Sequence, residues 1–422
     1  MVIDMLNTVP VTEEPIISEP ARNEIFVARQ PIFDSDLNVY AYELLFRDAN
    51  ANVAEIVDGN SASSQVMINA FLDIGLETIT DNRISFINLT RDFIVGQLPL
   101  LMPPEVVVLE ILEDVEVDDE LLTSLKAFSE KGYTLALDDY VFTEDKEPLF
   151  DIIDIVKIDI LECDRSKLEA EVKKLKAKNI KLLAEKVETH EEFEMCKSLG
   201  FDYFQGYFIS KPKVMSGQSL KPNRLSLLKI LAILEDPDCD ISELEALISQ
   251  DVTISYKILR IINSALYNLQ REIASVKQAI VALGLKTVRE WLVIIVLTDI
   301  DDKPHELIAL CLQRARMMQS LSEMAGINGD TAFTTGLFSS IDAIMDQSME
   351  DVLNELPLST EITDALLQRS GALGELLDIV MHYERGEWKD IDEGKQNSHD
   401  LGSYYLESLF WSTELFKQID RK

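Results

Sequence analysis

The sequence has few of the features that mark exported or membrane-inserted proteins. Its four cysteines, Cys163, Cys196, Cys239 and Cys311, stand singly and form no C-x-x-C pair, which argues against a disulfide framework and against a zinc site. No uninterrupted apolar run approaches the roughly 18–20 residues that a membrane-spanning helix needs. Residues 1–24 lack the basic segment of a signal peptide. We therefore expect a cytoplasmic protein that does not insert into membranes.

Basic residues are also scarce. The 422 residues include 39 Lys and Arg against 75 Asp and Glu, which gives a formal net charge of -36. Such a surface repels nucleic acids and anionic lipids, so a nucleic-acid polymer is not expected as a partner. A ligand that carries phosphate would need a local cation, either a metal ion or a few Lys and Arg side chains. A chain of this length is long enough for two domains.

In the first half of the chain, β-strand patterns end in polar residues. The run Leu135–Leu137 is followed directly by two adjacent carboxylates, Asp138 and Asp139. Other short β-rich runs deliver a polar residue near their ends in the same way, and these residues are Glu43, Asn88, Glu110, Lys157, Glu185 and Gln205. At the mouth of a barrel, side chains at strand ends point at whatever lies above the strands.

The alternation of patterns predicts an irregular, modified TIM (β/α)8 barrel whose first strand is antiparallel. The strands are expected at 25–33, 39–46, 84–90, 106–112, 134–139, 154–159, 181–187 and 203–208. The helices are expected at 61–76, after Arg91, and at 118–130, 164–178 and 190–199. An open doubly wound sheet would need a glycine-rich phosphate turn after the first strand, and the sequence has none.

Beyond residue 212 the strand patterns disappear. Apolar residues at i, i+3, i+4 and i+7 predict helices, and the segments are 224–235, 241–249, 254–262, 276–283, 288–297 and further helices from Pro304 onward. The predicted organisation is a flexible tail, a barrel, a linker and an all-α domain, at residues 1–23, 24–212, 213–223 and 224–422.

Closure of the barrel would bring several oxygen-bearing side chains together, namely Glu43, Asn88, Glu110, Asp138 and Asp139. Uncompensated carboxylates at such short range cost several kcal/mol through repulsion and partial desolvation. Divalent cations would remove this cost, and an all-oxygen set with an Asn carbonyl suits Mg²⁺ or Mn²⁺ rather than zinc. Two adjacent ions would suit phosphoryl hydrolysis, with Lys157 offsetting phosphate charge.

The order of the motifs resembles the EAL family over about residues 24–212. The motifs are Glu-Leu-Leu, Asn-Leu-Thr, Leu-Glu-Ile-Leu-Glu, Asp-Asp, Lys-Ile-Asp, Ala-Glu-Lys-Val-Glu and Gln-Gly-Tyr-Phe. EAL proteins are bacterial cyclic di-GMP phosphodiesterases with a modified TIM barrel. The resemblance implies two metal ions. Ligands of the first would be Glu43, Asn88, Glu110 and Asp138, and those of the second would be Asp138, Asp139 and Glu185.

The same resemblance implies roles for the remaining polar residues. Lys157 would orient the attacking water, and Glu185 would be a base or a metal ligand with Glu188 as its supporting carboxylate. Gln205 would lie in the active site. Arg47 would contact a substrate phosphate.

Two positions depart from the family pattern. Leu44 replaces the signature Ala, which is mainly a change of packing. The family loop Asp-Asp-Phe-Gly-Thr-Gly reads Asp138-Asp-Tyr-Val-Phe-Thr143, so both glycines are lost and a positive φ becomes costly at Val141. In the family this loop couples metal binding to dimerisation, which makes a homodimer one expectation.

Two functions therefore remain open. The complete ligand set favours a metal-dependent enzyme that converts cyclic di-GMP to linear pGpG. The altered loop favours a barrel that acts as a cyclic di-GMP receptor or a protein-interaction module. We rank hydrolysis first.

The helical half resembles the HDOD domain, an HD-like signalling module. The matching segments are Leu244–Val252, Tyr256–Ser264 and Ser275–Gly284. True HD hydrolases carry a metal-binding His-Asp pair, whereas Ser339 and Ser340 stand where that pair would be expected. The resemblance implies a module without metal chemistry of its own that binds an unidentified signalling protein.

Overall fold

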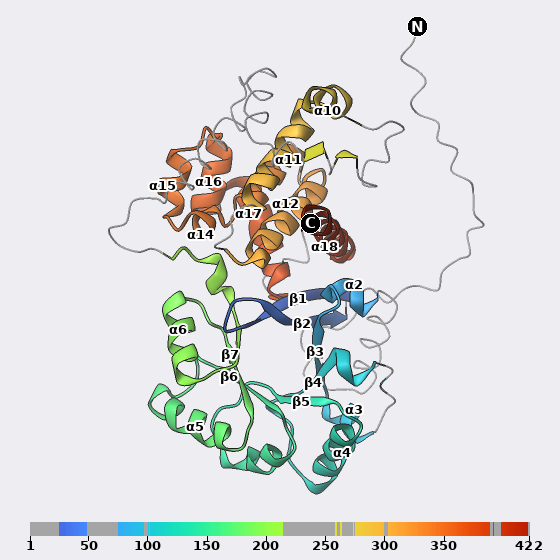
Figure 1. The fold of residues 1–422 in the computed structure, drawn as a ribbon, viewed down its shortest axis with the longest axis vertical. Coiled ribbons are helices and arrows are strands. Elements are labelled where there is room, and N and C mark those ends of the chain that lie inside the picture. The colour runs from blue at the N-terminus through green and yellow to red at the C-terminus, as the bar shows by residue number, and fades with distance from the viewer. Residues whose placement is uncertain are drawn as a thin grey trace, which may run out of the picture.

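The computed structural model describes most of the barrel and much of the helical half (Figure 1). The described residues are 25–48, 75–96, 102–213, 275–298, 303–388 and 398–420, with a few isolated positions between them. The predicted tail, most of the helix at 61–76, nearly all of the linker and the helices predicted before residue 263 lie outside the described residues, apart from isolated positions. Within the described ranges, no helix has both the length and the apolar character required to cross a bilayer.

Eight strands close into a barrel in chain order. Their bounds are β1 (Ile25–Asp34), β2 (Val39–Asp48), β3 (Ile84–Leu89), β4 (Val107–Ile111), β5 (Thr134–Leu137), β6 (Ile155–Asp159), β7 (Lys181–Glu185) and β8 (Tyr203–Gln205). β1 pairs antiparallel with both β2 and β8, whereas all other neighbours pair parallel. The predicted barrel with an antiparallel first strand is confirmed.

The α-helices of the barrel are α2 (Leu76–Thr80), α3 (Arg91–Val95), α4 (Asp119–Glu130), α5 (Arg165–Ala177) and α6 (His190–Leu199). Four of them, α3 to α6, follow the predicted positions closely, whereas α2 lies where no helix was predicted. The 3-10 helices are η1 (Pro104–Val106), η2 (Glu144–Asp151) and η3 (Tyr207–Ser210). The predicted strand 203–208 is too long, because the chain turns at Gly206 into η3.

An apolar layer fills the lower part of the barrel. Alternate residues of a strand face opposite sides of a sheet, so every strand can offer one inward side chain to each layer. The layer takes one residue from each strand, namely Ile32, Ala41, Phe86, Val108, Ala136, Ile155, Leu183 and Tyr203. All eight are buried, and they form the floor beneath the candidate site.

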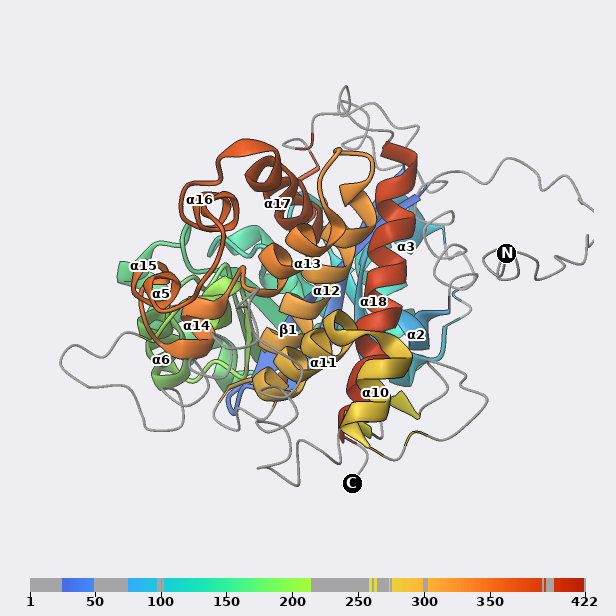
Figure 2. The same cartoon turned by 90° about the horizontal axis from the view of Figure 1, so that it is seen from above.

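The second domain is helical throughout its described residues. Its helices are α10 (Val276–Leu283), α11 (Leu285–Thr298), α12 (His305–Ser322), α13 (Gly329–Leu337), α14 (Ile341–Met345), α15 (Met349–Asn354), α16 (Thr360–Gln368), α17 (Gly371–Glu384) and α18 (Ser398–Asp420). α12 contacts α13, α17 and α18, and Figure 2 shows it at the centre of the domain. A Cβ at Gly336 would lie 2.6 Å from the backbone of Ala315, so this glycine allows α13 to approach α12 closely.

The helical domain packs on β1 and β2. Both α17 and α18 contact β1. The Arg29 amide donates to the Tyr405 hydroxyl at 3.0 Å, and the Tyr383 hydroxyl donates to the Val27 carbonyl at 3.3 Å. The Tyr42 hydroxyl donates to Glu306 at 2.9 Å. The antiparallel strand pair is therefore a wall that the two domains share.

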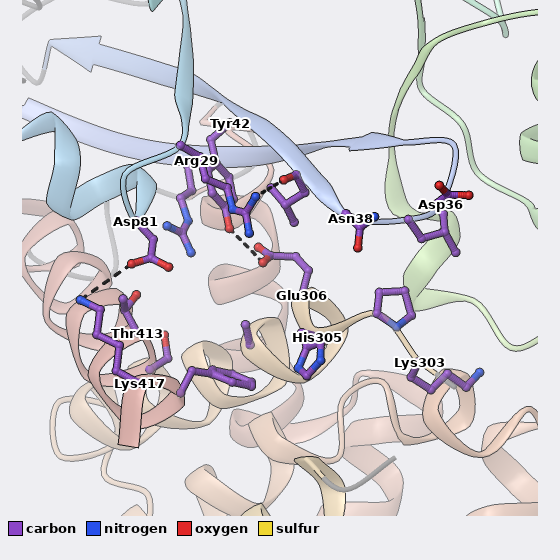
Figure 3. A pocket seen from close by; sticks show the side chains of 17 residues that line it. Arg29, Asp36, Asn38, Tyr42, Asp81, Lys303, His305, Glu306, Thr413 and Lys417 are labelled. Atoms are coloured by element: carbon purple, nitrogen blue, oxygen red, sulfur yellow. Dashed lines mark hydrogen bonds and ion pairs between the residues drawn. The ribbon is translucent and has the colours of Figure 1, made fainter. Parts of the chain in front are cut away.

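A cavity of about 620 Å³ lies beside this interface (Figure 3). Its lining includes Arg29 and Tyr42 from the barrel, Glu306 at the start of α12 and Lys417 near the end of α18. Burial raises the pKa of Glu306, and the nearby Arg29 guanidinium offsets only part of this rise. Tyr42 and Glu306 are both buried, so their hydrogen bond matters for the stability of the interface.

Replacement of Tyr42 by Phe should destabilise the domain interface. The change removes the hydroxyl that donates to Glu306 and leaves a buried carboxylate oxygen with one donor fewer, at a cost of about 1–3 kcal/mol. Denaturant unfolding of the full chain gives the change in the free energy of unfolding. Tyr404→Phe on α18 is the matched control and should change it by less than about 0.5 kcal/mol. Equal stability of the two variants would contradict the assignment.

Candidate active site

A polar layer lies directly above the apolar layer, toward the carboxyl ends of the parallel strands. In β2 to β8 it takes the residue two positions beyond the apolar one, so both face the barrel interior. β1 runs in the opposite direction, so Gln30 precedes Ile32 by two positions and lies opposite Glu43. The layer consists of Gln30, Glu43, Asn88, Glu110, Asp138, Lys157, Glu185 and Gln205.

The ammonium group of Lys157 lies among four carboxylates. Its Nζ is 2.7 Å from both Glu110 and Asp138, 2.9 Å from Glu185 and 3.4 Å from Glu43. Lys157 and Glu110 are fully buried. One positive charge thus faces four groups that are negative when ionised, which is the electrostatic setting of a cation site.

The pKa values of the buried groups reflect this crowding. Burial lowers the pKa of Lys157, but the surrounding carboxylates, led by Asp138 and Glu110, outweigh it and hold that pKa well above its ordinary value. Burial raises the pKa of Glu110 and of Glu185 well above the ordinary range, and the attraction of Lys157 offsets this only in part. Lys157 therefore stays protonated, while these two carboxyl groups bind protons more readily than they do in water.

Several buried oxygens of the site have no hydrogen-bond partner among the described residues. They are Asn88 Oδ1, Glu110 Oε2, Asp139 Oδ1 and Glu185 Oε2. Oxygens of Asp138, Asp139 and Glu185 lie within 4.8 Å of one another. Buried acceptors without donors are costly, and bound cations would satisfy them. The all-oxygen donor set fits Mg²⁺ or Mn²⁺.

Backbone hydrogen bonds hold the Asp138–Asp139 turn in place. The Asp138 amide donates to the Ile111 carbonyl at 2.9 Å, and the Tyr140 amide donates to the Lys157 carbonyl at 3.0 Å. Between them, Asp139 adopts a left-handed conformation with a φ of 38°.

The loop that follows differs from the sequence-based expectation. The cost of a positive φ was expected at Val141, but the left-handed residue is Phe142, with a φ of 59°. Val141 is instead 61% exposed, and its φ is not positive. The Phe142 ring packs edge-on against Tyr140, with ring centroids 5.6 Å apart. The contact between the two rings thus stabilises the left-handed backbone of Phe142. At this position the family pattern has Thr between two glycines.

Gly206 is required by the close approach of two backbone segments. Its φ is 145°, and a Cβ there would lie 2.1 Å from the Val187 carbonyl oxygen. The Val187 amide donates to the Gln205 carbonyl at 3.0 Å. This hydrogen bond holds the backbone of Gln205 in place, and thereby the side chain that Gln205 contributes to the polar layer.

The structure brings most of the predicted site residues together, with two exceptions. Those that meet are Glu43, Asn88, Glu110, Asp138, Asp139, Lys157, Glu185 and Gln205. Glu188 is exposed, and its amide donates to Glu192 at the start of α6. Arg47 lies on β2, and its side chain is outside the described part of the structure. Gln30 was missed, although its spacing from Ile32 on a reversed strand could have indicated it.

Family models match both parts of the chain. The EAL domain model matches residues 44–212, and the HDOD domain model matches residues 223–369. The chain is 34% identical over 403 residues to the uncharacterised protein YuxH of Bacillus subtilis, covering 93% of this chain and 98% of that protein. It is 33% identical over 404 residues to the cyclic di-GMP phosphodiesterase CdgJ of Vibrio cholerae, covering 93% and 94%. The fold and site define an EAL-type barrel, and the chain belongs to the family of tandem EAL–HDOD proteins.

Solved structures of EAL proteins are also similar to part of the chain. An EAL domain protein from Listeria monocytogenes is 21% identical and covers 44% of this chain and 87% of that chain, with a TM-score of 0.36. The PaMucR phosphodiesterase, solved in complex with cyclic di-GMP, is 18% identical and covers 44% and 95%, with a TM-score of 0.37.

Removal of the Lys157 charge should destabilise the metal-free protein strongly. Lys157→Met leaves the buried carboxylates without their cation. Loss of one partner of a buried ion pair lowers the free energy of unfolding by about 3–5 kcal/mol, and we expect a loss of this size here. The free energy of unfolding is measured in excess chelator and again in saturating Mn²⁺, where the deficit should shrink. Lys174→Met, at a partly exposed ion pair with Glu147, is the control and should cost less than about 1 kcal/mol. Equal losses for the two variants in chelator would contradict the role of Lys157 as counter-ion.

Gly206→Ala should destabilise the barrel by about 2–3 kcal/mol, because the new Cβ collides with the Val187 backbone. Gly284→Ala provides the comparison. That glycine also has a positive φ, 87°, but nothing lies within 4 Å of the added Cβ. It should therefore cost only about 1 kcal/mol. Chemical denaturation of both variants measures the difference, and a smaller loss at position 206 would show that the close approach is not required.

Proposed function

We propose that the barrel hydrolyses cyclic di-GMP to linear pGpG with the help of divalent cations. The observation that carries this proposal is the polar layer, in which four carboxylates surround a buried lysine and several of the other buried oxygens have no donor among the described residues. The full-length similarity to a cyclic di-GMP phosphodiesterase of Vibrio cholerae supports it. The reaction adds water across one phosphodiester bond, opens the ring and leaves one phosphate as a terminal group.

Oxygens of the polar layer, together with the neighbouring Asp139, would form two sets of metal ligands. Glu43, Asn88, Glu110 and Asp138 would hold one Mg²⁺ or Mn²⁺ ion, and Asp138, Asp139 and Glu185 would hold a second. Bound ions of this kind lower the pKa of water and neutralise charge on the phosphate. Asn88 Nδ2 lies 3.4 Å from Glu43 Oε1, which leaves the Asn88 carbonyl oxygen free of hydrogen bonds to the described residues.

Lys157 and Glu185 have complementary tasks. Because its pKa is held high, Lys157 remains an ammonium group and can only donate hydrogen bonds, so it orients water and attracts the phosphate but does not act as a base. Burial raises the pKa of Glu185, so this carboxyl group binds a proton more readily than it would in water, which suits a general base. By resemblance to the EAL family, Glu188 would support Glu185 and Arg47 would contact a substrate phosphate. Gln205 donates to Glu43 and would orient it.

A second candidate function is reception of cyclic di-GMP without turnover. The left-handed Phe142 in the loop after Asp139 favours it, because this loop departs from the family pattern beside the ligands of the second ion. Nucleotide binding without product formation in the presence of Mg²⁺ or Mn²⁺ would identify a receptor.

The helical domain serves as the interaction module of the chain. Ser339 and Ser340 accept hydrogen bonds from Arg314 at 3.1 and 2.9 Å, so they support a side chain in the core. We assign residues 24–212 to the barrel, 213–223 to the linker and 224–422 to this module. Its partner would be a signalling protein.

Loss of one metal ligand should abolish hydrolysis. Asn88→Ala and Asp138→Ala should each lower the turnover number by at least about 100-fold, since even residues that only support a ligand cost 10–100-fold. The measurement is chromatographic separation of pGpG from cyclic di-GMP after incubation with Mg²⁺ or Mn²⁺.

Asp151→Ala provides the control for this experiment. Asp151 forms an exposed ion pair with Lys178 outside the polar layer, so the variant should keep wild-type turnover. Unchanged turnover in either ligand variant, or full turnover in excess chelator, would show that the site is wrongly assigned.

A further inference from the structure

Gln30 completes the polar layer and faces a metal-ligand candidate on the neighbouring strand. It lies opposite Glu43 in the β1–β2 pair and is partly buried. Gln205 Nε2 donates to Gln30 Oε1 at 3.0 Å and to Glu43 Oε2 at 2.7 Å. The amide of Gln205 therefore joins Gln30 to Glu43.

The other end of the Gln30 side chain reaches the helical domain. Its Nε2 donates to the Arg385 carbonyl at 3.0 Å and lies 3.2 Å from the Tyr207 hydroxyl. A backbone carbonyl and an ionised carboxylate can only accept hydrogen bonds. The Arg385 carbonyl at one end and Glu43 at the other thus fix the orientation of both glutamine amides between them.

Arg385 contacts both domains. It is the C-terminal cap of α17, and its guanidinium lies 4.6 Å from the centre of the ring of Tyr207, which belongs to η3 of the barrel. The preceding residue, Glu384, accepts two hydrogen bonds from Arg314, at 2.7 and 2.8 Å. The side chains of Arg314 and Glu384 are both buried, so these hydrogen bonds connect the end of α17 to the core of the helical domain.

Gly386 brings the same segment against β2. Its φ is 69°, and a Cβ there would lie 2.6 Å from the Leu45 side chain. Leu45 follows Glu43 by two positions on the strand. The residues at the end of α17 therefore touch both strands that carry Gln30 and Glu43.

We propose that the C-terminal end of α17 sets the position of Glu43 through Gln30 and Gln205, so that the helical domain controls the metal site of the barrel. This inference rests on the proposed function. Gln30 acts here as a positioning residue for Glu43. A change in the helical domain that moves the Arg385 carbonyl reorients the Gln30 amide, removes one of the two acceptors of the Gln205 amide and loosens Glu43.

Titration of the metal-free full-length chain with Mn²⁺ alone, followed by calorimetry, tests the positioning role. Gln30→Met keeps the length of the side chain but removes both amide groups, and it should raise the dissociation constant for Mn²⁺ about 10- to 100-fold. Tyr207→Phe removes one partner of Gln30 and should give a smaller rise. Gln368→Met, at an exposed glutamine of α16, is the control and should bind Mn²⁺ as the wild type does.

Unchanged Mn²⁺ affinity in both Gln30→Met and Tyr207→Phe would overturn the positioning role, and Tyr207→Phe alone decides it if Gln30→Met does not fold. Turnover of cyclic di-GMP is recorded in parallel. A wild-type chain that binds Mn²⁺ but forms no pGpG would refute the proposed hydrolysis, while the binding data would still test the positioning of Glu43.

A double-mutant cycle tests control by the helical domain. Gly386→Ala strains the segment after α17, because its φ of 69° disfavours a side chain and the new Cβ meets the Leu45 side chain. It should weaken Mn²⁺ binding in the wild type but add little in the Gln30→Met background, since both changes act through one connection. If Gly386→Ala left Mn²⁺ binding unchanged in the wild type, or weakened it equally in both backgrounds, the proposed connection from α17 through Gln30 to Glu43 would be overturned.

Discussion

The attraction between the buried Lys157 ammonium and four carboxylates is the constraint on which the barrel depends. A floor of eight apolar side chains closes the barrel below this layer, so water cannot solvate the charges from that side. Acidic groups at such short range repel one another, and one lysine cannot neutralise all of them. The excess negative charge makes the site selective for cations, in a chain whose overall charge would otherwise repel a phosphate ligand.

Much of this layer could be predicted from the sequence because parallel strands obey a simple rule. Inward side chains recur every second residue, so a polar residue at the end of an apolar run lies at the mouth of the barrel. The rule found Glu43, Asn88 and Glu110. It missed Gln30, since on an antiparallel strand the polar residue comes before the apolar one, and in β1 it lies in the middle of the strand instead of at its end. The conformation of the loop at Phe142 could not be predicted either, because it depends on packing against Tyr140.

In the helical domain, Arg314 and Glu384 form a buried ion pair beside Ser339 and Ser340. From the sequence, these two serines indicated only that the metal ligands of HD hydrolases are missing there. Arg314 bonds to Glu384 through two nitrogens and to two serine hydroxyls through a third. Such a pair contributes little to stability relative to apolar packing, but its directional bonds fix the relative position of the helices that carry it. From the sequence, the serines argue against HD-type chemistry. Their actual partner, an arginine on another helix, could not be inferred without the fold.

The two faces of the β1–β2 pair explain how the domains can communicate across a packed interface. Because side chains alternate, Gln30 and Glu43 face the polar layer, while Arg29 and Tyr42 face the helical domain and its cavity. A displacement of either strand moves both sets of side chains together. Packed interfaces tend to switch between discrete arrangements instead of deforming gradually. The antiparallel first strand, which makes this barrel irregular, thereby gives the helical domain direct access to a wall of the active site.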